Sequence, residues 1–79
     1  MKYYTFEVVV EKEEEGEGYY AYCPTLPGCF SNGRTIEDTR LNVRKAIALH
    51  LASLRRHRRP IPQHERLVHL EALTIGLPA

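Results

Sequence analysis

The sequence predicts a small α+β domain with a three-stranded antiparallel meander, one long helix and a fourth strand reached by a crossover. Three observations predict it: an alternating apolar pattern over residues 3–11, a second strand-like run that ends in a proline-rich turn, and a helical pattern over residues 36–56. The chain has 79 residues, enough for one domain spanning 1–79. A domain of that size buries only about 60% of its unfolded surface, so we expect it to gain stability from a partner.

The first strand is expected over residues 3–11, where large apolar side chains occur at every second position. Tyr4, Phe6, Val8 and Val10 share one face, which is the period of a half-buried strand about 30 Å long. Residues 13–18 are mostly glutamate and glycine, which do not pack in a core. They predict a hairpin loop that leads into an antiparallel second strand over residues 19–23.

The second strand should end at a turn that contains two prolines. Pro24 and Pro27 each lack a backbone donor, so the ladder cannot continue through them. Leu26, between the prolines, is the only side chain of the loop that can anchor it in a core. Gly28 then provides the positive φ of a turn, and a short third strand is expected from Cys29 to Ser31.

The helix is expected from about residue 36 to residue 56. Gly33 can take a strained turn just before it, and Thr35 is placed to cap its first turn. The apolar stripe consists of Ile36, Val43, Ile47, Leu51 and Leu54, widened by Ala46 and Leu49. Arginines favour the negative end of the helix dipole, and Pro60 ends the helix.

Residues 67–75 fit two structures. Their apolar residues alternate as in a strand, but Leu67, Leu70 and Leu73 also fit a short helix. We predict a strand, because the fold needs a fourth one.

A spaced motif between Gly18 and Thr35 identifies a family. It reads Gly-Tyr-x-Ala-x-x-Pro-x-Leu-Pro-Gly-Cys-x-Ser-x-Gly-x-Thr, with one extra tyrosine in this chain. This pattern resembles the HicB family of bacterial antitoxins over roughly residues 3–75. The residues expected to maintain the motif's structure are Pro24, Leu26, Pro27, Gly28, Cys29, Gly33 and Thr35.

The resemblance implies both a fold and a function. The fold is a partial ribonuclease H-like sheet of order 3-2-1-4 with one helix packed on one face, and it also implies the fourth strand. The function is neutralisation of a HicA-type toxin, a small basic RNA-cleaving protein, by direct binding. Arg40 stands where the family pattern usually has a small residue. Family members commonly carry a DNA-binding segment after the fourth strand, and this sequence ends at Ala79, so DNA binding is not expected.

Charge is distributed unevenly, although the formal net charge is only +1. Residues 7–17 contain six glutamates and one lysine, whereas residues 34–66 contain nine arginines and lysines against three acids. The candidate partner-binding residues at the acidic hairpin are Glu13, Glu14, Glu15, Glu17 and Tyr19. The alternative is a loop tip that is merely solvated.

The basic cluster at the end of the helix has two interpretations. Arg55, Arg56, Arg58 and Arg59 either form a solvated helix end or contact nucleic-acid phosphates. The cluster has no aromatic side chains, so it lacks a platform on which bases could stack.

No metal, cofactor or catalytic site is predicted. The four histidines and two cysteines do not have metal-ligand spacing, and Glu7, Glu37, Asp38 and Glu71 fall on different layers or ends of the predicted fold. We therefore expect a protein that is not an enzyme, with no small-molecule substrate. Two cysteines and no apolar run of membrane length favour a cytoplasmic protein that does not bind a membrane.

The leading functional hypothesis is an antitoxin of the HicB type. The alternative is a stand-alone domain that binds nucleic acid or another protein through the basic helix end, with no toxin partner. A single helix covers only one face of the sheet, and the other face carries Tyr or Val residues from the first two strands. We therefore also expect a homodimer or a higher even oligomer, formed through that open face or a sheet edge.

Overall fold

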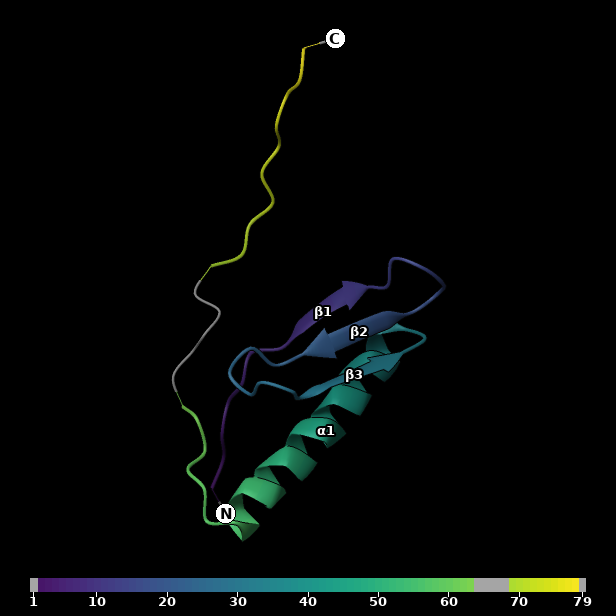
Figure 1. Ribbon diagram of the computed structural model, residues 1–79. Coiled ribbons are helices and arrows are strands. Elements are labelled where there is room, and N and C mark those ends of the chain that lie inside the picture. The colour runs from purple at the N-terminus through teal and green to yellow at the C-terminus, as the bar shows by residue number, and fades with distance from the viewer. Residues whose placement is uncertain (1, 64–68, 79) are drawn as a thin grey trace.

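The computed structural model describes residues 2–63 and 69–78. It contains strands β1 (Val9–Lys12), β2 (Tyr19–Tyr22) and β3 (Phe30–Gly33), followed by helix α1 (Ile36–Arg56). The strands form one antiparallel sheet in the order β1-β2-β3, and α1 lies across one face of it (Figure 1). The predicted α+β class and the order of three strands before one helix are confirmed.

The limits of α1 agree with the predicted ones. Thr35 is the N-cap, and its Oγ1 accepts a hydrogen bond from the backbone N–H of Asp38 at 3.0 Å. This bond satisfies one of the free donors of the first turn. Val43 is buried against the sheet, but Ile36 and Leu49 are exposed. The buried stripe is therefore narrower than the sequence indicates.

The turn with two prolines is folded around Leu26. The leucine side chain is 1% exposed and packs with the buried Cys23 and Cys29. The Leu26 N–H donates to the Cys23 carbonyl and the Cys29 N–H donates to the Leu26 carbonyl, both at 3.0 Å. Gly28 has φ of 84°, the positive value expected for it. The predicted burial of Leu26 is confirmed.

Gly33 has a different role from the predicted one. It is absent from the positive-φ residues, so it does not form a strained turn. It is instead the last residue of β3, and a Cβ atom there would lie 2.7 Å from the backbone nitrogen of Thr39 in α1. The glycine is required because the strand and the helix approach each other closely, a contact that no local pattern reveals.

The first strand has a shorter ladder than expected. Residues 3–8 belong to no strand, and only Val9–Lys12 pair with β2. The partner strand ends at Tyr22 because the turn with Pro24 follows it. Residues 3–8 therefore have no neighbouring strand within the described part of the chain.

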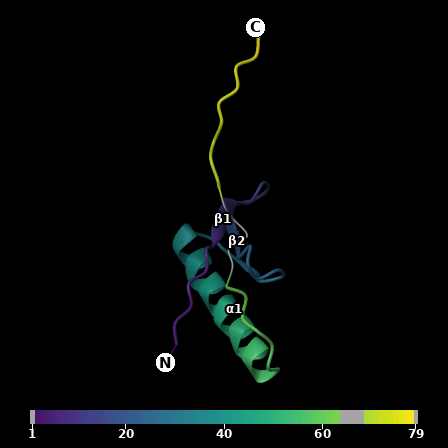
Figure 2. The same ribbon diagram turned by 90° about the vertical axis from the view of Figure 1, so that its left-hand side faces the viewer.

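The predicted fourth strand, 67–75, is not formed by its described part. Residues 67 and 68 lie outside the described residues, and residues 69–75 adopt no regular structure. A strand requires a hydrogen-bonded neighbour, but residues 69–78 extend away from the sheet and are exposed along their whole length (Figure 2). The strand order 3-2-1 is confirmed, and no fourth strand adjoins β1 within residues 2–63 and 69–78.

Candidate interaction surfaces

The loop between β1 and β2 presents a concentrated negative charge. The N–H of Glu13 donates to the Gly18 carbonyl at 3.0 Å, which closes the loop. Glu14, Glu15 and Glu17 are exposed and Glu13 is half-buried. None of them forms an ion pair with a described residue. The loop therefore concentrates four carboxylates at one end of the fold, and a negative field is expected there.

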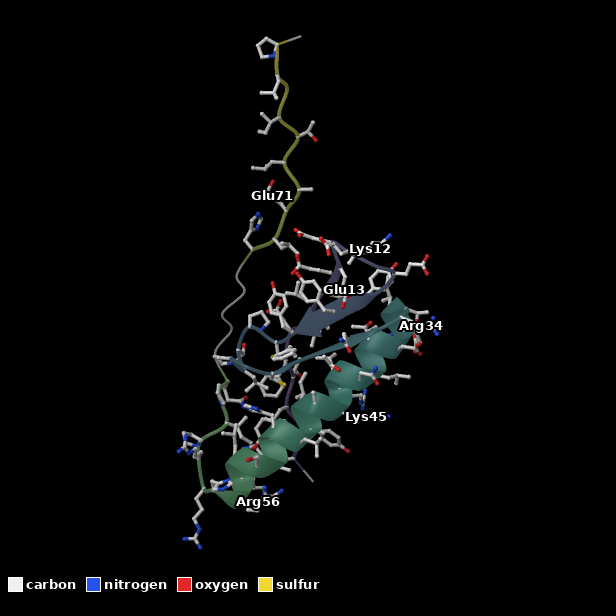
Figure 3. All side chains as sticks on the ribbon, turned by 45° about the vertical axis from the view of Figure 1, so that its right-hand side comes forward. Lys12, Glu13, Arg34, Lys45, Arg56 and Glu71 are labelled. Carbon is white, nitrogen blue, oxygen red and sulfur yellow. The ribbon has the colours of Figure 1, made fainter. Side chains whose placement is uncertain are left out.

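The basic cluster lies at the opposite end of the molecule. Figure 3 shows Lys12 and Glu13 at one end of the fold and Arg56 at the other. Arg55 and Arg56 belong to the last turn of α1, and Arg58 follows with φ of 55°. The N–H of Arg59 donates to the Leu54 carbonyl at 2.8 Å, so the backbone of the cluster is ordered. The charges give the molecule a negative pole and a positive pole.

The arginines surround a wide depression. Its lining includes Lys2 and Tyr4 from the N-terminal segment and Ile61 from the segment after α1. Arg55, Arg56, Arg58 and Arg59 are exposed, and none pairs with a carboxylate of residues 2–63 or 69–78. The depression is a positively charged surface that is accessible to an anion.

Tyr19 does not lie on the acidic surface. It pairs with Lys12 and Gly33 in the ladders and shares the helix-facing side of the sheet with the buried Ala21. Its side chain is half-buried. The structure thus brings the four glutamates together but places Tyr19 on another face.

The face of the sheet opposite α1 carries an apolar row. Val9, Tyr22 and Phe30 are paired across the three strands, and Phe30 is 69% exposed. The sequence indicated an open face of Tyr and Val residues but did not identify Phe30. Adjacent residues of a strand point to opposite faces of the sheet. Because Cys29 is buried, Phe30 next to it had to lie on the open face, and this was the signal that could have identified it.

A second row on the same face is polar. The hydroxyl of Tyr20 donates to Oε2 of Glu11 at 2.8 Å, and the ring of Tyr20 stacks on Tyr22 with centroids 6.4 Å apart. The hydrogen bond to Glu11, followed by desolvation and the charge of Glu11, raises the pKa of Tyr20 above its usual 10.0. The face therefore combines an exposed apolar row with an oriented phenol.

A groove of about 520 Å³ runs between the N-terminal segment and α1. One wall is formed by Tyr4, Phe6 and Val8, which alternate along the chain. The helix wall consists of Glu37, Arg40, Leu41, Val43, Arg44, Ile47, Ala48 and Leu51. Arg40, which departs from the family pattern, lies here and forms an ion pair with Glu37 at 3.5 Å.

Cys23 and Cys29 are both buried and free, so they form no disulfide. Within residues 2–63 and 69–78, no group of three or more potential ligands is arranged to hold a metal ion. In the same part of the chain, no helix combines the length and the apolar character that a membrane span requires.

Comparison with known proteins identifies the family. The model of the HicB_like antitoxin of bacterial toxin-antitoxin systems matches residues 6–74. The chain belongs to this family.

Relatives of this HicB-like chain are found in distant organisms. The UPF0150 protein ssr1765 of Synechocystis is 42% identical over 65 residues, which cover 82% of this chain and 81% of that protein. The UPF0150 protein Ta0767 of Thermoplasma acidophilum is 38% identical over 63 residues, covering 80% and 86% of the two chains. A UPF0150 protein of Helicobacter pylori is 44% identical over 46 residues, covering 58% and 61%. No solved structure matches the chain.

The match to the HicB-like family includes the whole turn with two prolines, from Cys23 to Cys29. It also includes the groove wall at Phe6 and Val8, and the acidic loop. The family is described as an antitoxin family, and its description names no enzymatic activity. The arginine cluster also lies within the match.

Proposed function

We propose that this HicB-like protein neutralises a HicA-type, RNA-cleaving toxin by binding it directly, with no catalytic chemistry of its own. The observation that supports the proposal most is the acidic loop between β1 and β2, where Glu13, Glu14, Glu15 and Glu17 lie within five positions. A protein that holds RNA needs a basic surface, because most of the affinity for RNA comes from its phosphates. The loop and that surface are electrostatically complementary.

The mechanism is steric exclusion of the substrate. The acidic pole attracts the basic toxin over a long range and orients it, and close ion pairs then hold the two surfaces together. The toxin's RNA-binding surface is covered in the complex. Arg56 lies at the opposite end of the fold from Glu13 (Figure 3), so the arginine cluster would face away from a toxin bound at the loop.

The proposal predicts that a small basic protein is encoded next to this chain, and the experiment uses that protein as the toxin candidate. Purified toxin candidate is incubated with RNA in the presence of increasing amounts of this chain, and RNA cleavage is measured. We expect cleavage to stop near an equimolar ratio. A variant with Glu13, Glu14, Glu15 and Glu17 changed to Gln should require a higher concentration, whereas Arg55→Gln with Arg56→Gln is the matched control at the other pole. Undiminished cleavage at a large excess of this chain would overturn the proposal.

We further propose that the protein is a homodimer or a higher even oligomer. The support is the row Val9, Tyr22 and Phe30 on the face that α1 leaves uncovered, together with residues 3–8, which pair with no strand within the described part of the chain. Light scattering at micromolar concentration tests this, with an even multiple of the 9.1 kDa chain mass as the expected result.

A second candidate function is nucleic-acid binding through the positive pole, without a toxin. It is favoured by Arg55, Arg56, Arg58 and Arg59, which surround one depression and form no ion pair with a carboxylate of residues 2–63 or 69–78. Binding of labelled RNA that weakens steeply with salt, together with no inhibition of the neighbouring protein, would favour this function over the antitoxin role.

A further inference from the structure

The segment 69–77 exposes four large apolar side chains, and three of them, Leu73, Ile75 and Leu77, occur at alternate positions, whereas Leu70 lies on the other face of an extended chain. Leu73, Ile75 and Leu77 are 74%, 75% and 87% exposed. In an extended chain, residues two apart lie on one face, so these three side chains form a single apolar edge. Exposed apolar surface of this kind indicates an interaction site.

The N-terminal segment offers a matching surface. Tyr4, Phe6 and Val8 also alternate, and they form one wall of the groove of about 520 Å³ along α1. The backbone of residues 3–8 belongs to no ladder within the described part of the chain. Its donors and acceptors are thus free to pair with an added strand, the usual way in which an exposed sheet edge binds a peptide segment.

We propose that residues 69–77 of a second copy of this chain add as a strand beside residues 3–8, and that the two copies exchange these segments reciprocally. Leu73, Ile75 and Leu77 of one copy then occupy the groove of the other, between its N-terminal segment and the helix residues Ile47 and Leu51. Three alternating apolar residues on each side match in number and period. A twofold axis makes the two contacts identical and closes the assembly.

The position of the segment favours a second copy over its own groove. Ile61 and Gln63 lie beside Lys2 and Tyr4, around the same depression at the N-terminal end of the groove. Residues 69–78 lie beyond the sheet, away from the groove (Figures 1 and 2). The long axis of the molecule consequently measures 58 Å, against 27 and 19 Å for the others. An apolar segment that projects this far from its own fold is positioned to reach another molecule.

The charges agree with this placement. Glu71 lies on the same face as Leu73 and would enter the groove with it. Arg40 and Arg44 line the groove along the first half of α1, while Lys2 and Arg55 lie near the other end. Glu71 would therefore lie near a cation whether the added strand runs parallel or antiparallel to residues 3–8.

This inference rests on the proposed self-association and is independent of toxin binding. The first test measures the mass of the full chain and of two single variants by light scattering. Ile75→Asp places a charge on the apolar edge and should halve the mass. Thr74→Asp, the adjacent residue on the opposite face, is the matched control and should retain the wild-type mass. Helical circular dichroism should be unchanged in both, because residues 69–78 contact no core residue.

The second test identifies which chain provides the strand. Thr5→Cys and Thr74→Cys are introduced together and joined with a short bismaleimide, and the products are separated under denaturing conditions. Exchange between copies yields a covalent dimer. The wild type is the control, since Cys23 and Cys29 are buried and burial raises the pKa of the Cys29 thiol.

The contrary results distinguish failure of self-association from failure of the segment exchange. A wild-type chain with the mass of one monomer would refute self-association, and the exchange with it. A dimer that persists in Ile75→Asp, or a cross-link within a single chain, would refute the exchange and leave self-association to the open face. RNA cleavage by the toxin candidate is measured separately and tests the antitoxin function alone.

Discussion

A Cβ atom on Gly33 would lie 2.7 Å from the backbone nitrogen of Thr39 and 2.8 Å from its Oγ1. Thr39 is fully buried, and its hydroxyl donates to the Thr35 carbonyl at 2.7 Å. The backbone of β3 thus lies directly against the first turn of α1. This contact ties the end of the sheet to the start of the helix.

Gly33→Ala should destabilise the fold by about 1–3 kcal/mol, the usual cost of inserting a methyl group into a packed site. The neighbouring atoms belong to backbone and to a hydrogen-bonded threonine, so neither can move without breaking a bond. Urea denaturation measures the loss. Gly76→Ala is the control, because nothing lies within 4 Å of its added Cβ. Equal stabilities of the two variants would contradict the close contact.

Leu26→Ala should cost about 2–5 kcal/mol, since the side chain is fully buried and a cavity would remain. The loop that it anchors contains two prolines and has no other core side chain of its size. Leu49→Ala is the matched control, a leucine that is 74% exposed, and should change stability by less than about 0.5 kcal/mol. A loss at Leu26 below about 1 kcal/mol in denaturant melts would show that the loop does not depend on this anchor.

Thr35→Ala removes the side-chain acceptor for the N–H of Asp38 and should destabilise the protein by about 1 kcal/mol. Thr35→Ser keeps a hydroxyl at the same position and should restore most of the stability. Thermal unfolding followed at 222 nm compares the two variants. Similar losses in both would mean that the threonine methyl group, and not the cap, is what matters.

Reversal of Glu13, Glu14, Glu15 and Glu17 to Lys should slow association with the basic toxin markedly at low salt and less at high salt. Screening shortens the field to about 10 Å at 0.1 M salt, so the difference should shrink as salt is added. Stopped-flow kinetics measures the rates. Replacing Arg55, Arg56, Arg58 and Arg59 by Gln should not slow association. An unchanged, salt-insensitive rate in the reversed loop would locate the contact elsewhere.

Tyr20 should titrate above the usual 10.0, because its phenolate would lose the hydrogen bond to Glu11 and lie beside that carboxylate. Glu11→Gln should lower the pKa of Tyr20, as followed by phenolate absorbance. The pKa is higher in the folded state than in the unfolded state, so this pair's contribution to stability is full below pH 10.0 and is lost as pH rises through the folded-state value. A titration unaffected by Glu11→Gln would contradict this role of the carboxylate.

The sequence alone determined the features whose causes lie within a few residues. The helix occupies 36–56 because a threonine cap, an apolar period and a terminal basic cluster with a following proline act locally. The turn around Leu26 was predictable for the same reason, since two prolines end the ladder and Gly28 permits positive φ. The acidic loop could also be recognised directly from its composition.

Only the tertiary structure decided the features that depend on contacts between distant segments. Gly33 is required by Thr39 on a different element, the ladder of β1 ends where its partner strand ends, and the groove exists because residues 4–8 lie beside α1. The alternation in residues 69–75 predicts the capacity to form a strand. A strand exists only where a neighbour completes its hydrogen bonds, and in this chain the described part of that segment extends away from its own sheet (Figure 1).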